Sequence, residues 1–353
     1  MGFGALRSGM HRLRGGRREA MYREILRDES YIRRLRAALR AQYGIEAYRI
    51  TPAERGYYGE TWKVQTASGD YFLKIDALPF HRVRFRRGLS VVDYLCGCGV
   101  DFAGEVVRTR RGELCWTFDG AAAGLFACID GKNVETDQTK PAEYQMLCQV
   151  YRLTKPWLGL PAATFSDEAA GEFYRRWEAL AAAPKTEGDR ALLALLEKFR
   201  DSHLHCARQL SRLAARCGQE KSPLYLTHGD AGGNFFAGKT QNYILDWDEA
   251  MYAPPERDAW VMGCYGWARD LFDDTLAANG VDGRLSMERL AYYCFHMYFF
   301  YLNEFLTVQP VCDQTWKAAG YLEDGWIKSR VAFADTVSRA LCTPGSMTAP
   351  ASC

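Results

Sequence analysis

Residues 224–258 read LYLTHGDAGGNFFAGKTQNYILDWDEAMYAPPERD. The pattern predicts a short apolar strand, a tight polar loop, a second strand that ends in acids, and a proline-rich turn. Polar side chains stand where the loop and the strand end, at Asp230, Asn234 and Asp246. An acid that accepts a hydroxyl proton, followed by an amide and a second acid, is the minimum set for phosphoryl transfer. Carboxylate and amide oxygens also suit Mg²⁺, which is usually held by one or two carboxylates together with substrate phosphates.

A β-hairpin whose polar side chains only cap turns is the alternative interpretation. Two motifs argue against it, HGDxxxN at 228–234 and LDWD at 245–248, because turn caps do not require these contexts. The kinase pattern places four residues between the catalytic Asp and the Asn, whereas only Ala231, Gly232 and Gly233 intervene here. Glycine reaches backbone conformations closed to other residues, so the shortened loop can still direct Asn234 toward a metal ion.

HGDxxxN followed by LDWD resembles the catalytic and metal-binding core of aminoglycoside phosphotransferases and their small-molecule kinase relatives. The tail DEAMYAPPERD, residues 248–258, further resembles the spectinomycin phosphotransferase branch. The resemblance covers residues 45–330 and implies an α+β, protein-kinase-like fold of two lobes. Its N-lobe would be an antiparallel five-stranded sheet and its C-lobe mainly helical, with the nucleotide in the cleft.

The resemblance also implies roles for the polar residues of this core. Asp230 would accept or orient the proton of the acceptor hydroxyl, and Asn234 and Asp246 would bind the metal. His228 would support the loop without reacting, and Asp248 would make a further metal or loop contact.

The first third of the chain is rich in predicted strands. Hydrophobic alternation and turn signals place them at 46–51, 61–66, 71–76, 105–109, 113–118 and 124–129. Leu73 and Ile75 share one face of their strand, so Lys74 points to the other face. In kinases a lysine on the third strand neutralises nucleotide phosphates, and an exposed edge lysine is the alternative. The glycine turn at 55–60 is not a complete G-x-G-x-x-G motif.

Two further parts of the nucleotide site follow from the resemblance. The short helix at 85–95 normally supplies a Glu partner for the lysine, but here its acid is Asp93, so the partner of Lys74 stays unassigned. The strand 124–129 would form the hinge between the lobes, with Ala127, Cys128 and Ile129 flanking the adenine. A buried edge strand without a ligand is the alternative.

The remaining chain has helical periodicity. It predicts helices at 21–43, 143–153, 167–182 and 189–217. Asp258 would be a helix N-cap or, by resemblance, a brace for the catalytic loop. Residues 292–301 are aromatic on every face, which indicates a buried core helix or else a substrate wall. Acids near this region would meet ammonium groups of a substrate or form a solvated face, namely Asp270, Asp273, Asp274 and Glu304.

Composition and length set the outer limits. The 353 residues are expected to divide into a basic tail at 1–20, an N-lobe at 21–130, a C-lobe at 131–342 and a tail at 343–353, with Met21 as an alternative start. The first forty residues hold eleven Arg against four acids, so the rest of the chain is mildly acidic and suits a cationic substrate. Twelve scattered Cys without a C-x-x-C pair are typical of a cytoplasmic protein. The longest apolar run, 290–302, is shorter than the ~20 residues that span a bilayer.

Together, the patterns and the resemblance imply a cytoplasmic O-phosphotransferase that uses ATP, or GTP, with Mg²⁺ and binds neither nucleic acid nor membrane. An aminoglycoside or aminocyclitol hydroxyl is the expected acceptor. Choline, ethanolamine or a sugar is the alternative within the same chemistry, and the aromatic helix would supply cation–π contacts to it. A nucleotide-binding regulator without transfer activity is the alternative from another class.

Overall fold

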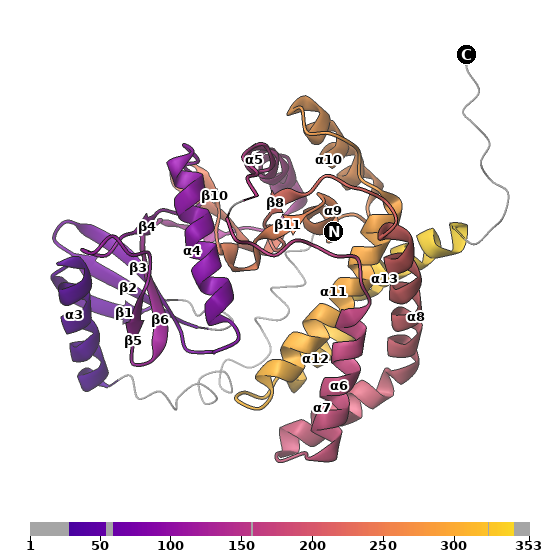
Figure 1. Ribbon diagram of the computed structural model, residues 1–353. Helices are drawn as coiled ribbons and strands as arrows, with labels where there is room; N and C mark the ends of the chain where they lie inside the picture. Colours follow the sequence, from indigo (N-terminus) through magenta and orange to yellow (C-terminus); the bar gives the residue numbers. More distant parts are fainter. Residues whose placement is uncertain (1–27, 54–58, 157, 324, 342–353) are drawn as a thin grey trace. The chain divides into compact units, whose positions relative to one another are not determined.

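The computed structural model describes residues 28–53, 59–156, 158–323 and 325–341 (Figure 1). The predicted tails and most of the glycine turn at 55–60 lie outside these residues. The chain forms two compact units. The first takes in the described residues up to Ala162 together with Leu224–Ala253 and Ala277–Val281. The second comprises Ala163–Pro223, Pro254–Leu276 and the described chain from Asp282 onward.

An antiparallel sheet occupies the N-terminal part of the first unit. Its strands follow the order β1-β2-β3-β6-β4, and β5 also pairs with β6, so the sheet has six strands, as many as the predicted segments and one more than the five that the resemblance implies. The bounds are β1 Ala47–Pro52, β2 Glu60–Thr66, β3 Gly69–Asp76, β4 Val106–Val107, β5 Trp116–Phe118 and β6 Ala121–Ala127. All six strands lie within one residue of predicted segments or overlap them, which confirms the antiparallel assignment.

Two helices cover opposite faces of this sheet (Figure 1). Helix α3, Glu29–Tyr43, begins at the N-cap Asp28 and ends at Gly44 in the left-handed conformation. Its apolar face joins one cluster with β3 residues Leu73 and Ile75. Helix α4, Arg82–Gly97, packs against β6 on the other face. Lys74 lies opposite Gly124 of β6, whose surroundings are α4 side chains, so the predicted orientation of Lys74 is correct.

The rest of the first unit holds two small sheets and one long helix. The strands are β7 Gly131–Asn133, β8 Tyr225–Thr227, β9 Phe235–Gly238, β10 Asn242–Ile244 and β11 Met251–Ala253. They pair in the orders β10-β9-β7 and β11-β8. Short 3₁₀ turns punctuate them: η1 Asp137–Thr139, η2 Gly232–Asn234 and η3 Trp247–Glu249. Helix α5, Lys140–Arg152, packs against β8 and buries its apolar side.

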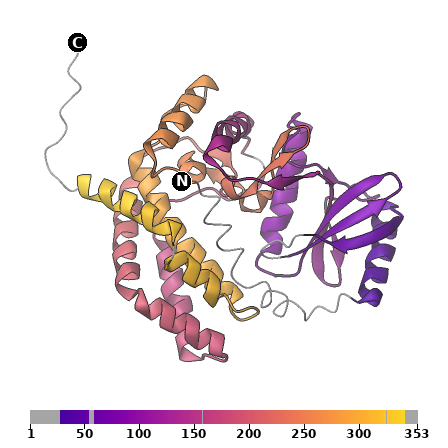
Figure 2. The ribbon, with the colours of Figure 1, turned by 180° about the vertical axis from the view of Figure 1, so that it is seen from behind.

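The second unit is helical. Its helices are α6 Glu168–Ala182, α7 Glu187–Lys198, α8 Arg200–Cys217, α9 Glu256–Ala259, α10 Gly266–Ala278, α11 Met287–Val308, α12 Thr315–Leu322 and α13 Trp326–Ala340. Helix α11 contacts α6, α8 and α13, and Figure 2 shows the yellow α13 lying along the orange α11. The aromatic stretch 292–301 is largely buried in this core, as the core-helix interpretation predicts.

Two local predictions were wrong. The segment 189–217 is two helices that meet at Phe199, and both bury apolar residues in the same cluster. Asp258 is not an N-cap, because α9 already begins at Glu256, directly after Pro254 and Pro255. Proline suits the first positions of a helix, so the turn starts earlier than the acid.

A buried histidine in this core gives a test by pH. The His203 side chain is fully buried, and its Nδ1 lies 2.7 Å from the Tyr298 hydroxyl. Burial lowers the pKa of His203 to about 4 from its ordinary value near 6.5. Between pH 6.5 and pH 4, His203 therefore binds a proton in the unfolded chain but not in the folded chain. The stability that is present above pH 6.5 is lost as the pH falls toward 4.

One pKa unit corresponds to about 1.4 kcal/mol, so His203 should account for about 3 kcal/mol of the unfolding free energy that is lost on acidification. We expect His203→Gln to lose that much less unfolding free energy than wild type between pH 7 and pH 4. Urea unfolding at pH 7 and pH 4 measures the difference for each protein. His296 has a similarly lowered pKa, so the variant keeps part of the dependence. An identical loss in wild type and variant would show that His203 is protonated in the folded state.

Candidate functional site

The loop between β8 and β9 is held by a buried histidine. Gly229 has φ +88°, a left-handed conformation that favours glycine, and it turns the chain between His228 and Asp230. The His228 Nε2 donates to the Leu245 carbonyl at 3.0 Å, and its Nδ1 accepts the Asp230 N–H at 3.2 Å. This network assigns the neutral Nε2–H tautomer. The ring also packs edge-on against Trp247, with centroids 4.5 Å apart. His228 thus joins the loop to the strand end that carries LDWD.

The shortened loop brings the amide and the first acid into contact. The Asn234 Nδ2 donates to the Asp230 backbone carbonyl at 2.8 Å and to its Oδ2 at 3.0 Å. Gly232, Gly233 and Asn234 form the 3₁₀ turn η2, so three intervening residues suffice to fold Asn234 back over Asp230. With its nitrogen engaged in this way, the side-chain carbonyl oxygen of Asn234 is the atom suited to bind a cation.

Hairpin register places Asp246 at the same end of β9 and β10. Phe235 pairs with Ile244, and the next residues along are joined by the Leu245 N–H bonded to the Asn234 carbonyl at 3.1 Å. Asp246 follows directly, with φ +65° and ψ +65°. This left-handed backbone is uncommon for a residue with a side chain and costs about 1–3 kcal/mol, although Asp tolerates it better than most. Its side chain is 46% exposed.

Lys74 of β3 reaches this acidic turn. Its Nζ lies 2.7 Å from Asp246 Oδ1 and 2.6 Å from Asp248 Oδ2, although 172 residues separate the lysine from the nearer acid. The Lys74 side chain is 14% exposed and that of Asp248 only 9%. The predicted lysine and the predicted acids therefore converge within the first unit.

The charges of this cluster influence one another. Burial opposes the ammonium of Lys74, but the carboxylates of Asp246 and Asp248 outweigh it and raise the pKa of Lys74. Loss of hydration likewise opposes the Asp246 carboxylate, and the Lys74 charge overcomes it and holds the pKa of Asp246 below its ordinary value. Burial raises the pKa of Asp248 to about 6, with the Asp246 charge adding to the shift and Lys74 opposing it. The two acids are thus chemically unequal.

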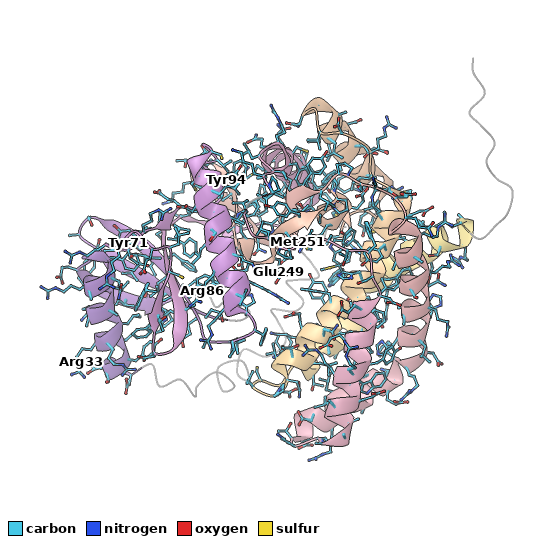
Figure 3. The ribbon with its side chains drawn as sticks, in the orientation of Figure 1. Arg33, Tyr71, Arg86, Tyr94, Glu249 and Met251 are labelled. Carbon is cyan, nitrogen blue, oxygen red and sulfur yellow. The ribbon has the colours of Figure 1, made fainter. Side chains whose placement is uncertain are left out.

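The helix acid named in the sequence does not reach the lysine. Asp93 on α4 accepts both hydrogen bonds at 2.6 Å from Arg108. Glu249, labelled in Figure 3, lies beside α4 and accepts from Arg84 at 2.9 Å. The ion pairs of Lys74 are instead with Asp246 and Asp248.

Sequence reasoning missed two buried residues next to the cluster, Asp76 at the end of β3 and His81 just before α4. The Asp76 Oδ1 accepts the Leu78 N–H at 3.0 Å, and its Oδ2 is bonded to His81 Nδ1. The other ring nitrogen of His81 lies 3.8 Å from Asp248 Oδ2. Their signal was weak, because an Asp and a His five residues apart around a turn form no recognised motif.

The oxygen ligands present fit a magnesium site of the open kind. Asp246 offers an accessible carboxylate and Asn234 an amide oxygen on the adjoining strand end. Within the described chain, no three His, Cys, Asp or Glu side chains form a group able to hold a metal ion. Mg²⁺ seldom needs such a cage, because it keeps waters and substrate phosphates as ligands.

Comparison with known proteins decides the family. A model described as the phosphotransferase enzyme family matches residues 49–293, which is more than half of the chain. The chain belongs to the phosphotransferase enzyme family. It is therefore an enzyme that transfers phosphate to a hydroxyl group, and the predicted resemblance is confirmed.

Several solved structures share the fold of this chain. A spectinomycin phosphotransferase, solved with ADP and spectinomycin, is 17% identical, with TM-score 0.66 over 85% of this chain and 98% of that one. An amicoumacin kinase, solved with AMP-PNP, Ca²⁺ and Ami, is 13% identical, with TM-score 0.55 over 93% of this chain and 96% of that one. A microcompartment-associated aminopropanol kinase is 13% identical, with TM-score 0.57 over 89% and 98%. No curated protein sequence matches the chain. The protein-kinase-like fold of the phosphotransferase is confirmed.

The predicted hinge of the phosphotransferase is partly engaged with its own backbone. The N–H groups of Ala127 and Cys128 donate to Glu105 O at 3.0 Å and Asp70 O at 3.2 Å. Ile129 follows in the connection to β7. Of the three residues predicted to flank the adenine, Ile129 is thus the one without a backbone hydrogen bond among those of the described chain.

The predicted substrate acids and Asp258 belong to the second unit. Asp270 and Asp274 of α10 are exposed. Asp273 accepts the Leu285 N–H at 2.8 Å, which gives it a structural contact, and Glu304 of α11 is 6% exposed. The four acids therefore differ in exposure, and Asp270 and Asp274 form a solvated face of α10. None of the described helices combines the length and the hydrophobicity that spanning a bilayer requires.

Proposed function

We propose that the phosphotransferase moves the terminal phosphoryl group of ATP to a hydroxyl of an aminoglycoside- or aminocyclitol-type molecule. The observation that carries this proposal is the convergence of Lys74 on Asp246 and Asp248, beside a loop in which Asn234 holds Asp230. An ammonium, a cation-binding carboxylate and a positioned base are the parts that phosphoryl transfer combines.

Nucleotide binding would use the sheet side of this cluster. Lys74 would contact the phosphates, and the backbone N–H of Ile129 would bond the nucleobase while Ala127 and Cys128 pack beside it. Adenine nucleotides in the spectinomycin phosphotransferase and the amicoumacin kinase support ATP as the donor. GTP would meet the same backbone groups and is the alternative donor.

A divalent cation, Mg²⁺ in our proposal, would be held by Asp246 and the amide oxygen of Asn234. Bound there, it would neutralise charge on the phosphates. Asp246 is half exposed, so its carboxylate can take a cation without unfolding the turn. His228 keeps the two ligands in register, because it hydrogen-bonds the Leu245 carbonyl directly before Asp246.

Asp230 would serve as the base. The acceptor hydroxyl oxygen forms a bond to the terminal phosphorus, the bond from that phosphorus to the nucleoside diphosphate breaks, and the hydroxyl proton passes to the Asp230 carboxylate. The Asn234 amide bonds the Asp230 Oδ2 at 3.0 Å and so fixes the orientation of the carboxylate. Positioning and charge neutralisation supply most of the rate in this chemistry.

The acceptor class rests on the tail DEAMYAPPERD and on the exposed acids Asp270 and Asp274, which would meet ammonium groups. A small amino alcohol is the second candidate, because the fold of the aminopropanol kinase is similar and carries the same reaction class.

We expect Asp230→Asn to lower kcat by about 10²–10⁴-fold, the usual contribution of a general base. Its nucleotide affinity should stay within about twofold of wild type, because the amide keeps the size of the carboxylate. ATP consumption measured over aminoglycosides, spectinomycin, choline, ethanolamine and sugars identifies the acceptor on which kcat is then compared. Unchanged turnover in Asp230→Asn would refute the role of Asp230 as the base. If the wild-type protein bound ATP but turned over no acceptor, the alternative of a nucleotide-binding regulator without transfer activity would be favoured.

The cation site has its own test without an acceptor. Mg²⁺ with ATP should raise the melting temperature of wild type, and Asp246→Ala should lose most of the shift, since binding to the folded state stabilises it by mass action. Asp93→Ala is the matched control, because Asp93 pairs with Arg108 on the surface of the same unit. Equal Mg²⁺-dependent shifts in all three proteins would exclude Asp246 as the ligand.

A further inference from the structure

Helix α4 presents no acid to Lys74. Its buried residues are Phe85, Gly88, Leu89, Val91, Val92 and Leu95. The Lys74 Nζ instead lies over the Phe85 ring, 5.3 Å from its centroid. An ammonium that is largely removed from water needs a charged partner, and that partner comes from another part of the first unit.

Asp248 occupies the space where a side chain of α4 would begin. A Cβ added to Gly88 would stand 2.7 Å from Asp248 Oδ1, 3.0 Å from the Asp248 backbone nitrogen and 3.0 Å from the Trp247 carbonyl carbon. Real Cβ atoms essentially never show the first of these distances, and the two backbone distances are tighter than nine in ten real Cβ contacts, so glycine at 88 is what allows α4 to pack this closely on η3. The Asp248 carboxylate of η3 thus lies where a side chain of α4 would otherwise reach toward Lys74.

Two buried residues, His81 and Asp76, lie on the side of Asp248 away from solvent. The His81 Nε2 lies 3.8 Å from Asp248 Oδ2, within ion-pair range though too long for a direct hydrogen bond. The opposite nitrogen of the ring is bonded to Asp76, whose side chain is fully buried and also accepts the Leu78 N–H. Asp76 ends β3 and His81 directly precedes α4, so the pair joins the strand of Lys74 to the helix that covers it.

The two acids that contact Lys74 differ in accessibility. Asp246 is 46% exposed and Asp248 is 9% exposed. A bound cation can therefore take Asp246 away from the lysine, whereas Asp248 stays enclosed between Lys74, His81 and the backbone of α4. Only the enclosed carboxylate can fix the ammonium both before and after the nucleotide arrives.

We propose that Asp248, backed by His81 and Asp76 and admitted by Gly88, is the positioning residue for Lys74 in place of a helix glutamate. This inference rests on the proposed function, in which Lys74 contacts the nucleotide phosphates. In this proposal Asp248 positions the Lys74 ammonium, and the buried Asp76–His81 pair supports Asp248.

Nucleotide affinity measured by calorimetry without acceptor, together with KM for each substrate, tests the proposal. We expect Asp248→Asn to weaken ATP binding and raise KM for ATP by about tenfold, the loss that removal of one charge-assisted hydrogen bond produces. KM for the acceptor should stay within about twofold. His81→Gln should act in the same direction. In a Lys74→Met background, Asp248→Asn should have no further effect, because the two residues act as a unit.

A glycine pair in α4 provides a test that changes no charge. Gly88→Ala should push Asp248 from Lys74 and weaken ATP binding, whereas a Cβ at Gly97 meets nothing within 4 Å, so Gly97→Ala should behave as wild type. This pair carries the test if Asp248→Asn does not fold. Wild-type affinity in both Asp248→Asn and Gly88→Ala would overturn the positioning role, as would tighter binding in Asp248→Asn. A wild-type protein that neither binds ATP nor transfers phosphate would refute the proposed function itself.

Discussion

The ion cluster of Lys74 with Asp246 and Asp248 is the interaction on which the site depends. It joins the N-terminal sheet to the end of a hairpin more than 170 residues later. Such a cluster is a poor source of stability, because the cost of removing charges from water offsets their attraction. Removing one partner from a buried pair nevertheless costs about 3–5 kcal/mol. The cluster is therefore best understood as a device for placing charge, which is what a triphosphate site requires.

The hydrogen bonds of His228 and the backbone conformation at Asp246 help to place these charges. His228 bonds to the Asp230 N–H within the loop between β8 and β9 and to the Leu245 carbonyl directly after β10, so one side chain joins the two segments. The left-handed backbone at Asp246 turns one carboxylate toward solvent, and two residues later Asp248 is turned inward. The spacing of LDWD thus produces one exchangeable acid and one enclosed acid, with Trp247 packed between them.

Local motifs made much of this predictable. The strands alternate clearly, and the HGDxxxN and LDWD motifs place Asp230, Asn234 and Asp246 at loop and strand ends where the structure also has them. Lys74 could be assigned to the correct face because strand alternation is strict. What failed depends on tertiary packing. The break at Phe199, the early start of α9 and the Asp76–His81 pair arise from contacts between elements, for which one sequence carries no local signal. The partner of Lys74 could not be predicted for the same reason. The resemblance implies an acid on the helix, whereas α4 has Gly88 facing Asp248, which comes from a distant turn.

A crystal structure of the phosphotransferase with Mg²⁺ and a non-hydrolysable ATP analogue tests the central claim most directly. We expect the Lys74 Nζ to lie within about 3 Å of both a phosphate oxygen and the Asp248 carboxylate, hydrogen-bond distance in each case, with Asp246 turned to the cation. A nucleotide bound elsewhere, or a Lys74 that leaves Asp248 when the nucleotide binds, would contradict the account.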